Sequence, residues 1–108
     1  MKIVDYNDIS YVIGENAKDN WNILDIYSNI NNKYIWFHLN SFSSPYVIML
    51  STNNIQSYLN YGGYLCKSNT KYKNIQNLKI CYTTLSKLKK TEKIGEVEIK
   101  GKKNIIKL

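Results

Sequence analysis

The sequence predicts an α+β fold, a single two-layer domain in which two main helices pack on a mostly antiparallel sheet. Three observations support this class. Short runs of branched and aromatic residues recur along the chain, as in strands, and two longer segments carry apolar residues at helical spacing. Their order is roughly ββαββαβββ, without repeats or a linker. At 108 residues, 44% of them hydrophobic, the chain suits one core and one domain spanning 1–108.

The N-terminal third is predicted to form a strand pair and a helix. Lys2–Asp5 and Ser10–Gly14 are short apolar runs separated by a polar turn, which is typical of two strands. Either Asn16 or Asp19 could cap the helix that follows, because a short polar side chain accepts a hydrogen bond from the first free N–H groups. We expect this helix to run to Tyr27, before an asparagine-rich loop.

Two central strands follow. Ile35–Leu39 and Tyr46–Leu50 are rich in branched and aromatic residues, and the serine-containing loop between them ends at Pro45, which cannot donate to a strand ladder. Trp36 and His38 share one face of the first strand, because side chains alternate along a strand. This face either meets water or a ligand, or lies in the core with His38 hydrogen-bonded. Alternation alone leaves both orientations open.

A second helix is predicted from a cap at Asn53 or Asn54 to about Asn69, where apolar residues recur every three to four positions. Gly62 and Gly63 lie inside this helix, and each costs about 1 kcal/mol of helix stability relative to alanine. A helix usually accepts such residues where its backbone packs closely against another element, so we expect close packing there.

The C-terminal third is predicted to add three strands. Leu78–Thr84 is a strand-like run that leads into a lysine-rich segment around Lys87. Glu96–Lys100 and Asn104–Leu108 are expected to pair as a terminal hairpin around Gly101-Lys102-Lys103, whose two lysines would lie at a solvated tip. The last of these strands is also a candidate for an unpaired edge that could accept a strand from a partner.

Positive charge is concentrated in the second half of the chain. The net charge is +7, and residues 1–54 hold three lysines against five acidic residues, a charge of −2, which leaves +9 for residues 55–108. Every basic residue is lysine, which contacts phosphate as a point charge but lacks the planar fork with which arginine reads guanine. This favours a partner recognised through its phosphate backbone and shape. The alternative is a solvated lysine surface that only keeps the protein in solution.

The sequence lacks the patterns of catalytic and metal sites. His38 has no carboxylate partner in sequence, there is no glycine-rich phosphate loop, and Cys66 and Cys81 do not form a C-x-x-C pair. We therefore expect no enzymatic activity, no metal and no cofactor, with both cysteines as buried free thiols. No apolar run approaches the length of a membrane span or of a signal peptide, so we expect no membrane association and a cytoplasmic or nuclear location.

Three segments, in order along the chain, resemble the NFACT RNA-binding domain (NFACT-R): the G-x-N-x-x-x-N pattern of Gly14, Asn16 and Asn20, the I-W-F-H signature at 35–38, and the strand, basic segment and closing region at 82–97. The resemblance spans about residues 10–108 and is strongest to the small stand-alone eukaryotic members of the family. It implies nucleic-acid binding. The longer relatives bind tRNA on stalled 60S subunits, in ribosome-associated quality control, and support template-free tail synthesis; we carry over only the binding.

Two positions depart from the family pattern. Tyr34 replaces the acidic residue before the I-W-F-H signature, and Tyr46 replaces a histidine in the serine-containing loop. If those family residues orient the histidine in relatives, the orientation of His38 is lost or replaced here. Stacking of a base on Trp36 or Tyr46 would survive the change.

The sequence therefore predicts a non-catalytic module that binds structured RNA, such as tRNA or rRNA. Seven residues are expected to make the contacts: Trp36, His38, Tyr46, Lys18, Lys87, Lys89 and Lys90. Four are expected to shape the fold around them: Gly14, Asn16, Asn20 and Phe37. Two alternatives stay open, namely a protein-interaction module that docks on ribosomal or quality-control proteins, and a general binder of DNA or other polyanions.

Overall fold

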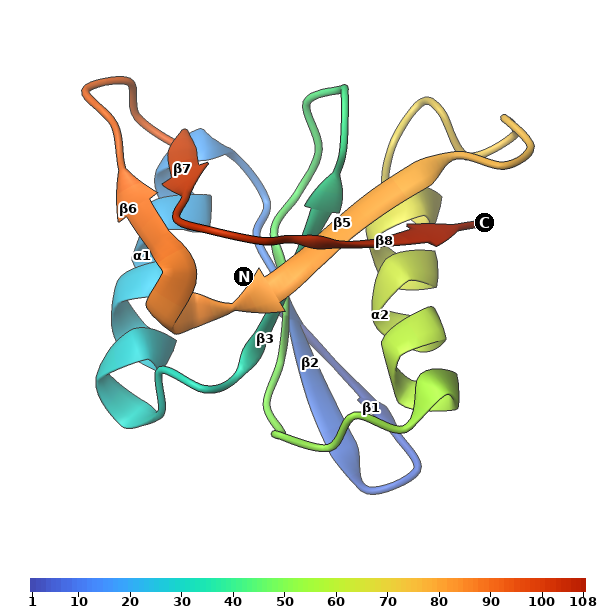
Figure 1. Ribbon diagram of the computed structural model, residues 1–108, viewed down its shortest axis with the longest axis horizontal. Coiled ribbons are helices and arrows are strands. Elements are labelled where there is room, and N and C mark those ends of the chain that lie inside the picture. Colours follow the sequence, from blue (N-terminus) through green and yellow to red (C-terminus); the bar gives the residue numbers. More distant parts are fainter.

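A six-stranded sheet forms the centre of the protein, with one helix on each of its faces. The computed structural model describes residues 1–108, and its two helices lie on opposite sides of the sheet (Figure 1). A second, two-stranded sheet lies beside the first helix. The elements in chain order are β1 (Lys2–Tyr6), β2 (Ile9–Ile13), α1 (Ala17–Ile30), β3 (Ile35–Leu39), β4 (Val47–Met49), α2 (Gln56–Ser68), β5 (Lys79–Thr84), the 3-10 helix η1 (Leu85–Lys87), β6 (Leu88–Lys90), β7 (Val97–Ile99) and β8 (Asn104–Lys107).

Every pair of neighbouring strands in the large sheet is antiparallel. The spatial order is β1-β2-β4-β3-β5-β8, so β3 and β4 are central while β1 and β8 form the two edges. Strand β3 has the bounds that the sequence predicts. The α+β class, the two helices and the mostly antiparallel sheet are therefore confirmed.

Each face of the sheet has its own hydrophobic core, which makes three layers rather than the two that we predicted. On one side Phe37 belongs to a cluster with Leu59 of α2, and on the other side Trp36 belongs to a cluster with Ile23 of α1. Neighbouring residues of β3 thus enter opposite cores, because side chains alternate along a strand. Because β3 is apolar on both faces, its sequence does not show whether helices cover one face of the sheet or both.

The start of each helix follows from local hydrogen bonds. The Oδ1 atom of Asn16 accepts a hydrogen bond from the amide of Asp19 at 2.8 Å, so Asn16 caps α1, one of the two predicted options. In α2 the capping position is Ile55 rather than Asn53 or Asn54. The Asn53 side chain instead accepts a hydrogen bond from the Ile55 amide at 2.9 Å and shapes the turn before the helix.

The predicted terminal hairpin around Gly101 is wrong. Strand β7 pairs with β6, and β8 crosses to the edge of the large sheet and pairs with β5. Val97 and Ile99 of β7 pack against the core on the α1 side, whereas Ile106 of β8 is buried in the core on the α2 side. Because the two strands serve different cores they separate after Gly101, whose φ of +86° lets the chain turn.

The structure also places the two cysteines. Cys66 and Cys81 are free thiols and both are buried, as predicted. Cys66 of α2 belongs to the core on that side of the sheet, and Cys81 belongs to the core on the α1 side, so the sheet separates the two thiols. Neither helix has the length and apolar character needed to cross a bilayer.

Candidate nucleic-acid interface

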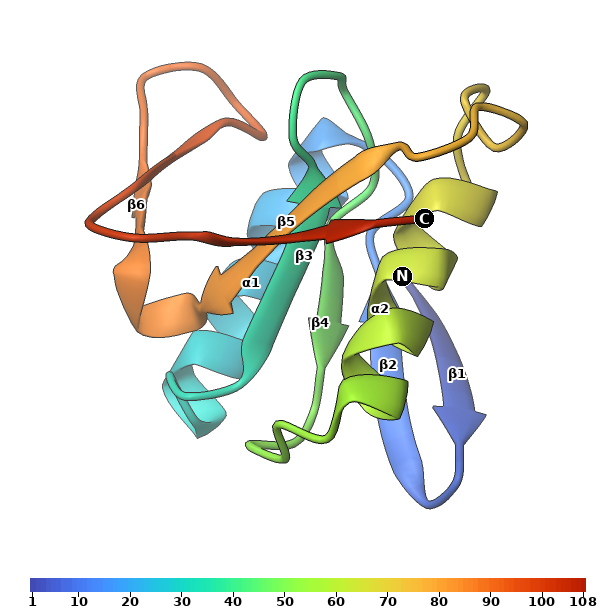
Figure 2. The ribbon, with the colours of Figure 1, turned by 45° about the vertical axis from the view of Figure 1, so that its right-hand side comes forward.

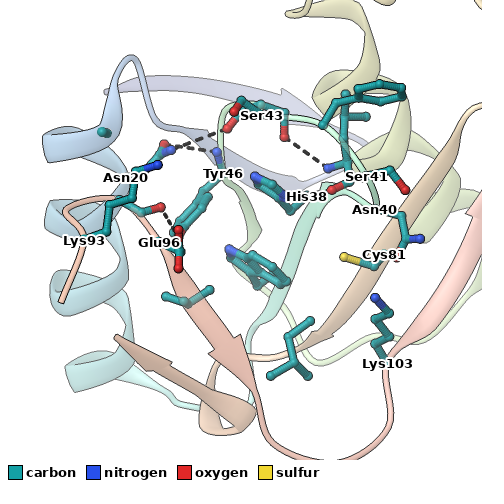
Figure 3. Close-up of a pocket in the computed structure, with 18 of the residues that line it drawn as sticks. Asn20, His38, Asn40, Ser41, Ser43, Tyr46, Cys81, Lys93, Glu96 and Lys103 are labelled. Atoms are coloured by element: carbon teal, nitrogen blue, oxygen red, sulfur yellow. Dashed lines mark hydrogen bonds between the residues drawn. The ribbon is translucent and has the colours of Figure 1, made fainter. Parts of the chain in front are cut away.

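A pocket of about 770 Å³ opens at one end of the sheet, on the side covered by α1. The ends of β3 and β5 line it together with the first turn of α1, the segments 40–44 and 93–97, and the linker after β7. Figure 3 shows His38 in the middle of this site, with Tyr46 on one side and Cys81 on the other. We call this the His38 pocket.

Three aromatic rings pack together at the His38 pocket. The ring planes of Trp36 and His38 are within 3° of parallel with centroids 5.6 Å apart, and Tyr46 packs edge-on against both, at 5.3 Å and 5.6 Å. Trp36 is only 2% exposed and Tyr46 is 1% exposed. Of the two orientations left open by the sequence, the chain adopts the one with Trp36 in the core. The expected stacking of a base on Trp36 or Tyr46 does not fit this fold, because neither ring has a free face.

His38 is neutral at pH 7 and has one unused nitrogen. Its Nδ1 atom lies 2.7 Å from the carbonyl oxygen of Leu39, and because a carbonyl only accepts, Nδ1 carries the hydrogen. Burial lowers the pKa of His38 below 6.5, and the hydrogen bond to Leu39 opposes this effect. The Nε2 atom therefore holds a lone pair, and it makes no hydrogen bond within the chain. No group of three or more His, Cys, Asp or Glu side chains is arranged to hold a metal ion.

The hydrogen bond to the Leu39 carbonyl orients His38 although Tyr34 and Tyr46 stand where an acidic residue and a histidine were expected from the sequence resemblance. A backbone group fixes the ring of His38, so the orientation needs no carboxylate at Tyr34 and no second histidine at Tyr46. Tyr46 packs against the same ring instead. The geometry makes His38 a hydrogen-bond acceptor rather than a source of positive charge.

Gly14 and Asn20 shape this end of the sheet. Asn20 is 6% exposed, and its Oδ1 accepts a hydrogen bond from the Tyr46 amide at 3.0 Å, which fastens α1 to the strand region before β4. A Cβ atom at Gly14 would overlap the Asn20 side chain, so only glycine leaves room for it. The contacts of the G-x-N-x-x-x-N pattern are therefore structural in this chain.

The β6–β7 loop forms the wall of the pocket near α1. The Oη atom of Tyr46 donates a hydrogen bond to the carbonyl of Gly95 at 2.6 Å, and Nε1 of Trp21 donates to the carbonyl of Glu96 at 3.2 Å. Gly95 has a φ of +84° and packs against Ala17. Burial and, secondarily, the Glu96 carboxylate raise the pKa of Tyr46, so its hydroxyl stays a donor at neutral pH.

None of the lysines predicted to contact phosphate lines the His38 pocket: Lys18, Lys87, Lys89 and Lys90. Lys90 is engaged within the chain, since its Nζ lies 2.7 Å from Oδ2 of Asp25 and 4.9 Å from the centroid of the Trp21 ring. Lys89 lies opposite Glu98 in the β6–β7 register. An acidic neighbour thus offsets part of the charge of this segment.

The sheet face around His38 is uncovered on its β8 side. His38 lies opposite Cys81 in the β3–β5 register, and Cys81 lies opposite Ile105 in the β5–β8 register, so the three side chains share one face. Ile105 is 42% exposed, which shows that neither helix reaches this part of the sheet. We call the part that runs from Cys81 across β8 the open face.

Three lysines lie on the open face: Lys79, Lys103 and Lys107. Each stands two residues from Cys81 or Ile105 along the chain, so alternation places it on the same side. Lys79 and Lys107 are directly opposite each other in the register. Burial raises the pKa of the Cys81 thiol and the positive charge of Lys103 opposes this, which agrees with the position of Lys103 beside Cys81 in Figure 3. These lysines are not among the predicted contact residues, although Lys79 stands between apolar residues in the strand-like run Leu78–Thr84, which was a usable signal.

An exposed aromatic pair lies beside the His38 pocket. Phe42 is 40% exposed and stacks on Tyr72, with ring centroids 4.2 Å apart, and the Nζ of Lys71 lies 5.4 Å from the centroid of the Tyr72 ring. The loop after β3 carries Phe42 and the segment before β5 carries Tyr72, and both lie at the same end of the sheet (Figure 2). A second hollow of about 570 Å³ is lined by these two segments. We call this pair the Phe42 stack; only the tertiary structure brings its members together.

A solved structure shares this fold. The structure of the C-terminal part of the fibronectin/fibrinogen-binding protein from Streptococcus suis matches with a TM-score of 0.83, over 93% of this chain and 40% of that one, at 16% sequence identity. The chain therefore spans less than half the length of that structure, and similarity at this identity shows the fold alone. No family model and no curated protein matches the sequence.

Proposed function

We propose that this chain is a non-catalytic nucleic-acid-binding module for structured RNA, such as tRNA or rRNA. The observation that carries the proposal is the open face, where Lys79, Lys103 and Lys107 lie on the same side of the sheet as His38 and where neither β5 nor β8 has an acidic residue. Contacts to phosphate groups supply much of the affinity in nucleic-acid complexes. The net charge of +7 adds long-range attraction for a polyanion.

The pairing of Lys79 with Lys107 across β5 and β8 favours binding of an anionic partner. Like charges directly opposite each other on an antiparallel strand pair destabilise the sheet. Neither lysine forms an ion pair within the chain. A phosphate group bound between them would relieve the repulsion, so binding of a polyanion should also stabilise the fold.

The Phe42 stack supports an RNA partner in particular. Structured RNA exposes unpaired bases in loops, bulges and ends, and proteins bind such bases by stacking them on aromatic side chains. Phe42 provides the exposed ring that the buried Trp36 and Tyr46 do not. The sequence resemblance to NFACT-R supports the same choice of RNA over DNA.

Fluorescence anisotropy of labelled tRNA across a salt series tests the proposal. We expect micromolar or tighter binding with a log–log salt slope of about −3 to −5, as four to six phosphate contacts would give. Duplex DNA should compete poorly. Absence of binding at low salt would contradict the proposal, and equal competition by DNA would replace it with general binding of polyanions.

Two double substitutions that remove equal charge locate the interface. Lys79→Gln with Lys107→Gln should weaken tRNA binding about tenfold and reduce the salt slope by about 2. Lys87→Gln with Lys89→Gln, on the segment favoured by the sequence, removes the same charge and should change the affinity less than about twofold. Equal losses in the two variants would show that net charge, and not the open face, determines binding.

A second matched pair tests the stacking. Phe42→Ala should cost about 1–3 kcal/mol of binding free energy if a base stacks on Phe42. Tyr64 is an aromatic residue on α2 that is 55% exposed, against 40% for Phe42, and it lines neither of the two hollows, so Tyr64→Ala should leave tRNA affinity unchanged. Unchanged affinity in Phe42→Ala would remove the Phe42 stack from the interface.

A protein-interaction module is a second candidate, because β8 is an edge strand of the large sheet. Its outer backbone groups could pair with a strand from a ribosomal or quality-control protein. The related fold belongs to a protein whose name states binding of fibronectin and fibrinogen, which is compatible with this use. Partners retained in a pull-down after nuclease treatment would favour this candidate, and loss of all partners would favour RNA binding.

A further inference from the structure

Three residues that line the His38 pocket carry a hydrogen-bonding atom without a partner in the protein. Nε1 of Trp36 and Oδ1 of Asn40 are buried and neither has a hydrogen-bond partner, and Nε2 of His38 makes no hydrogen bond within the chain. All three residues line the pocket. Buried polar groups in native proteins are nearly always hydrogen-bonded, and an unpaired one is costly. The pocket is therefore suited to a ligand that brings polar groups of its own.

The three atoms define the chemistry of that ligand. The indole N–H of Trp36 only donates, the side-chain oxygen of Asn40 only accepts, and Nε2 of neutral His38 accepts. A complementary ligand must present one acceptor and two donors within a small volume. A nucleobase edge presents donors and acceptors side by side, and ribose hydroxyl groups donate.

The charges around the pocket indicate where a phosphate would lie. Lys93 and Lys103 line the pocket from different segments, and Figure 3 shows Lys93 near Glu96 and Lys103 near Cys81. Glu96 offsets the charge of Lys93. Neither β5 nor β8, the two strands beside Lys103, carries an acidic side chain. Lys103 also belongs to the open face, so it connects the pocket to the row of lysines.

We infer that the His38 pocket takes one unstacked ribonucleotide of the bound RNA, with its phosphate at Lys103 and its base and ribose hydrogen-bonded to Trp36, Asn40 and His38. This inference rests on the proposed RNA-binding function. The volume of about 770 Å³ lies within the range typical of small-molecule sites. Structured RNA offers such nucleotides where bases are unpaired.

The two indole N–H signals in an NMR spectrum test the inference. Trp36 and Trp21 are the only tryptophans, Trp21 already donates to Glu96, and Trp21→Phe assigns the two signals. Titration with AMP or CMP should shift the Trp36 signal at millimolar concentration, and the 2′-deoxy forms should bind more weakly because they lack a donor for His38.

Variants separate the pocket from the rest of the interface. His38→Phe keeps an aromatic ring at this position but removes the Nε2 acceptor. It should weaken mononucleotide binding about tenfold. Asn40→Ala, in the segment after β3, removes the second acceptor and serves the same purpose if His38→Phe does not fold. Lys79→Gln lies outside the pocket, so it should weaken tRNA binding and leave mononucleotide affinity unchanged.

Different results would rule out the ribonucleotide pocket and the binding of structured RNA. An unmoved Trp36 signal at about 10 mM nucleotide, or an equal shift with inorganic phosphate alone, overturns the inference about the pocket. If tRNA still binds in that case, the proposed function stands without it. If mononucleotides bind and tRNA does not, the proposed function is overturned and the ribonucleotide site is retained.

Discussion

Gly62 of α2 lies directly against the ring of Phe37 in β3. A Cβ atom at Gly62 would stand 2.5 Å from Cε1 and 2.9 Å from Cε2 of that ring, closer than side chains approach in folded proteins. The neighbouring Gly63 leaves more room, because the nearest atom to its Cβ would be Cδ1 of Leu108 at 3.1 Å. The close packing predicted for this glycine pair is confirmed, and it places α2 on β3, one of the two central strands of the sheet.

Gly62→Ala should lower the free energy of unfolding by about 1–3 kcal/mol, because overpacking against Phe37 exceeds the gain of about 1 kcal/mol in helix propensity. Gly63→Ala is the matched control, since its neighbour is the end of a flexible side chain. It should be neutral or stabilising by up to about 1 kcal/mol. Urea denaturation measures both variants, and equal stabilities would show that the Phe37 ring moves aside freely.

The stability of the protein should fall as the pH drops below about 6.5. Burial lowers the pKa of His38 in the folded state, so the unfolded chain, with its ordinary pKa near 6.5, takes up the proton first. The contribution is fully present above that pH and is lost as the pH falls toward the folded-state pKa, by at most about 1.4 kcal/mol per pH unit. Denaturation between pH 5 and 7 measures it.

His38→Phe is the control for this pH dependence. The variant has no titrating ring at that position, so its stability curve should be flat in the same window, whatever its absolute stability. A slope that persists in the variant would assign the effect to groups other than His38.

Tyr46→Phe should destabilise the fold by about 1–2 kcal/mol, because it removes the hydrogen bond to the Gly95 carbonyl and leaves that carbonyl without its partner. Tyr64 has an exposed hydroxyl without a hydrogen bond to the protein, so Tyr64→Phe should change stability by less than about 0.5 kcal/mol. Hydrogen exchange should accelerate in the β6–β7 loop of the first variant only. Unchanged exchange there would mean that Tyr46 does not hold the loop.

Both thiols should resist alkylation in the native protein and react fully in denaturant. Burial raises the pKa of Cys66 to about 12 and also raises that of Cys81, so the reactive thiolate is scarce at neutral pH. Cys81 should react faster than Cys66, because the positive charge of Lys103 favours its thiolate. Peptide mapping by mass spectrometry distinguishes the two sites, and native labelling at the rate of a free thiol would show that the cores open readily.

Several features of the fold were predictable because they depend on residues close together in sequence. The bounds of the strand Ile35–Leu39 follow from its branched and aromatic composition, and the cap at Asn16 follows from the reach of a short polar side chain to the amide of Asp19. The glycine pair in α2 indicated close packing for a similar reason, since a helix bears that cost only where something replaces the lost stability.

Other features depended on which apolar faces meet. Trp36 could not be oriented because β3 is apolar on both sides, and only the positions of α1 and α2 on opposite faces assigned it to the core. The hairpin around Gly101 was wrong because β7 and β8 bury their side chains in different cores. That error also concealed Lys103, which the predicted hairpin placed at a solvated tip rather than beside Cys81.

The sequence by itself determined the α+β class, the order and approximate bounds of most elements, and the excess of lysine in the second half, but it did not predict the short strand β6. The tertiary structure decided which residues share a surface: it buried Trp36 and Tyr46, brought Phe42 onto Tyr72, and placed Lys79 opposite Lys107. The physical reason is that alternation and capping are set by neighbouring residues, whereas strand pairing and the covering of each sheet face are set by competition between distant apolar surfaces for burial.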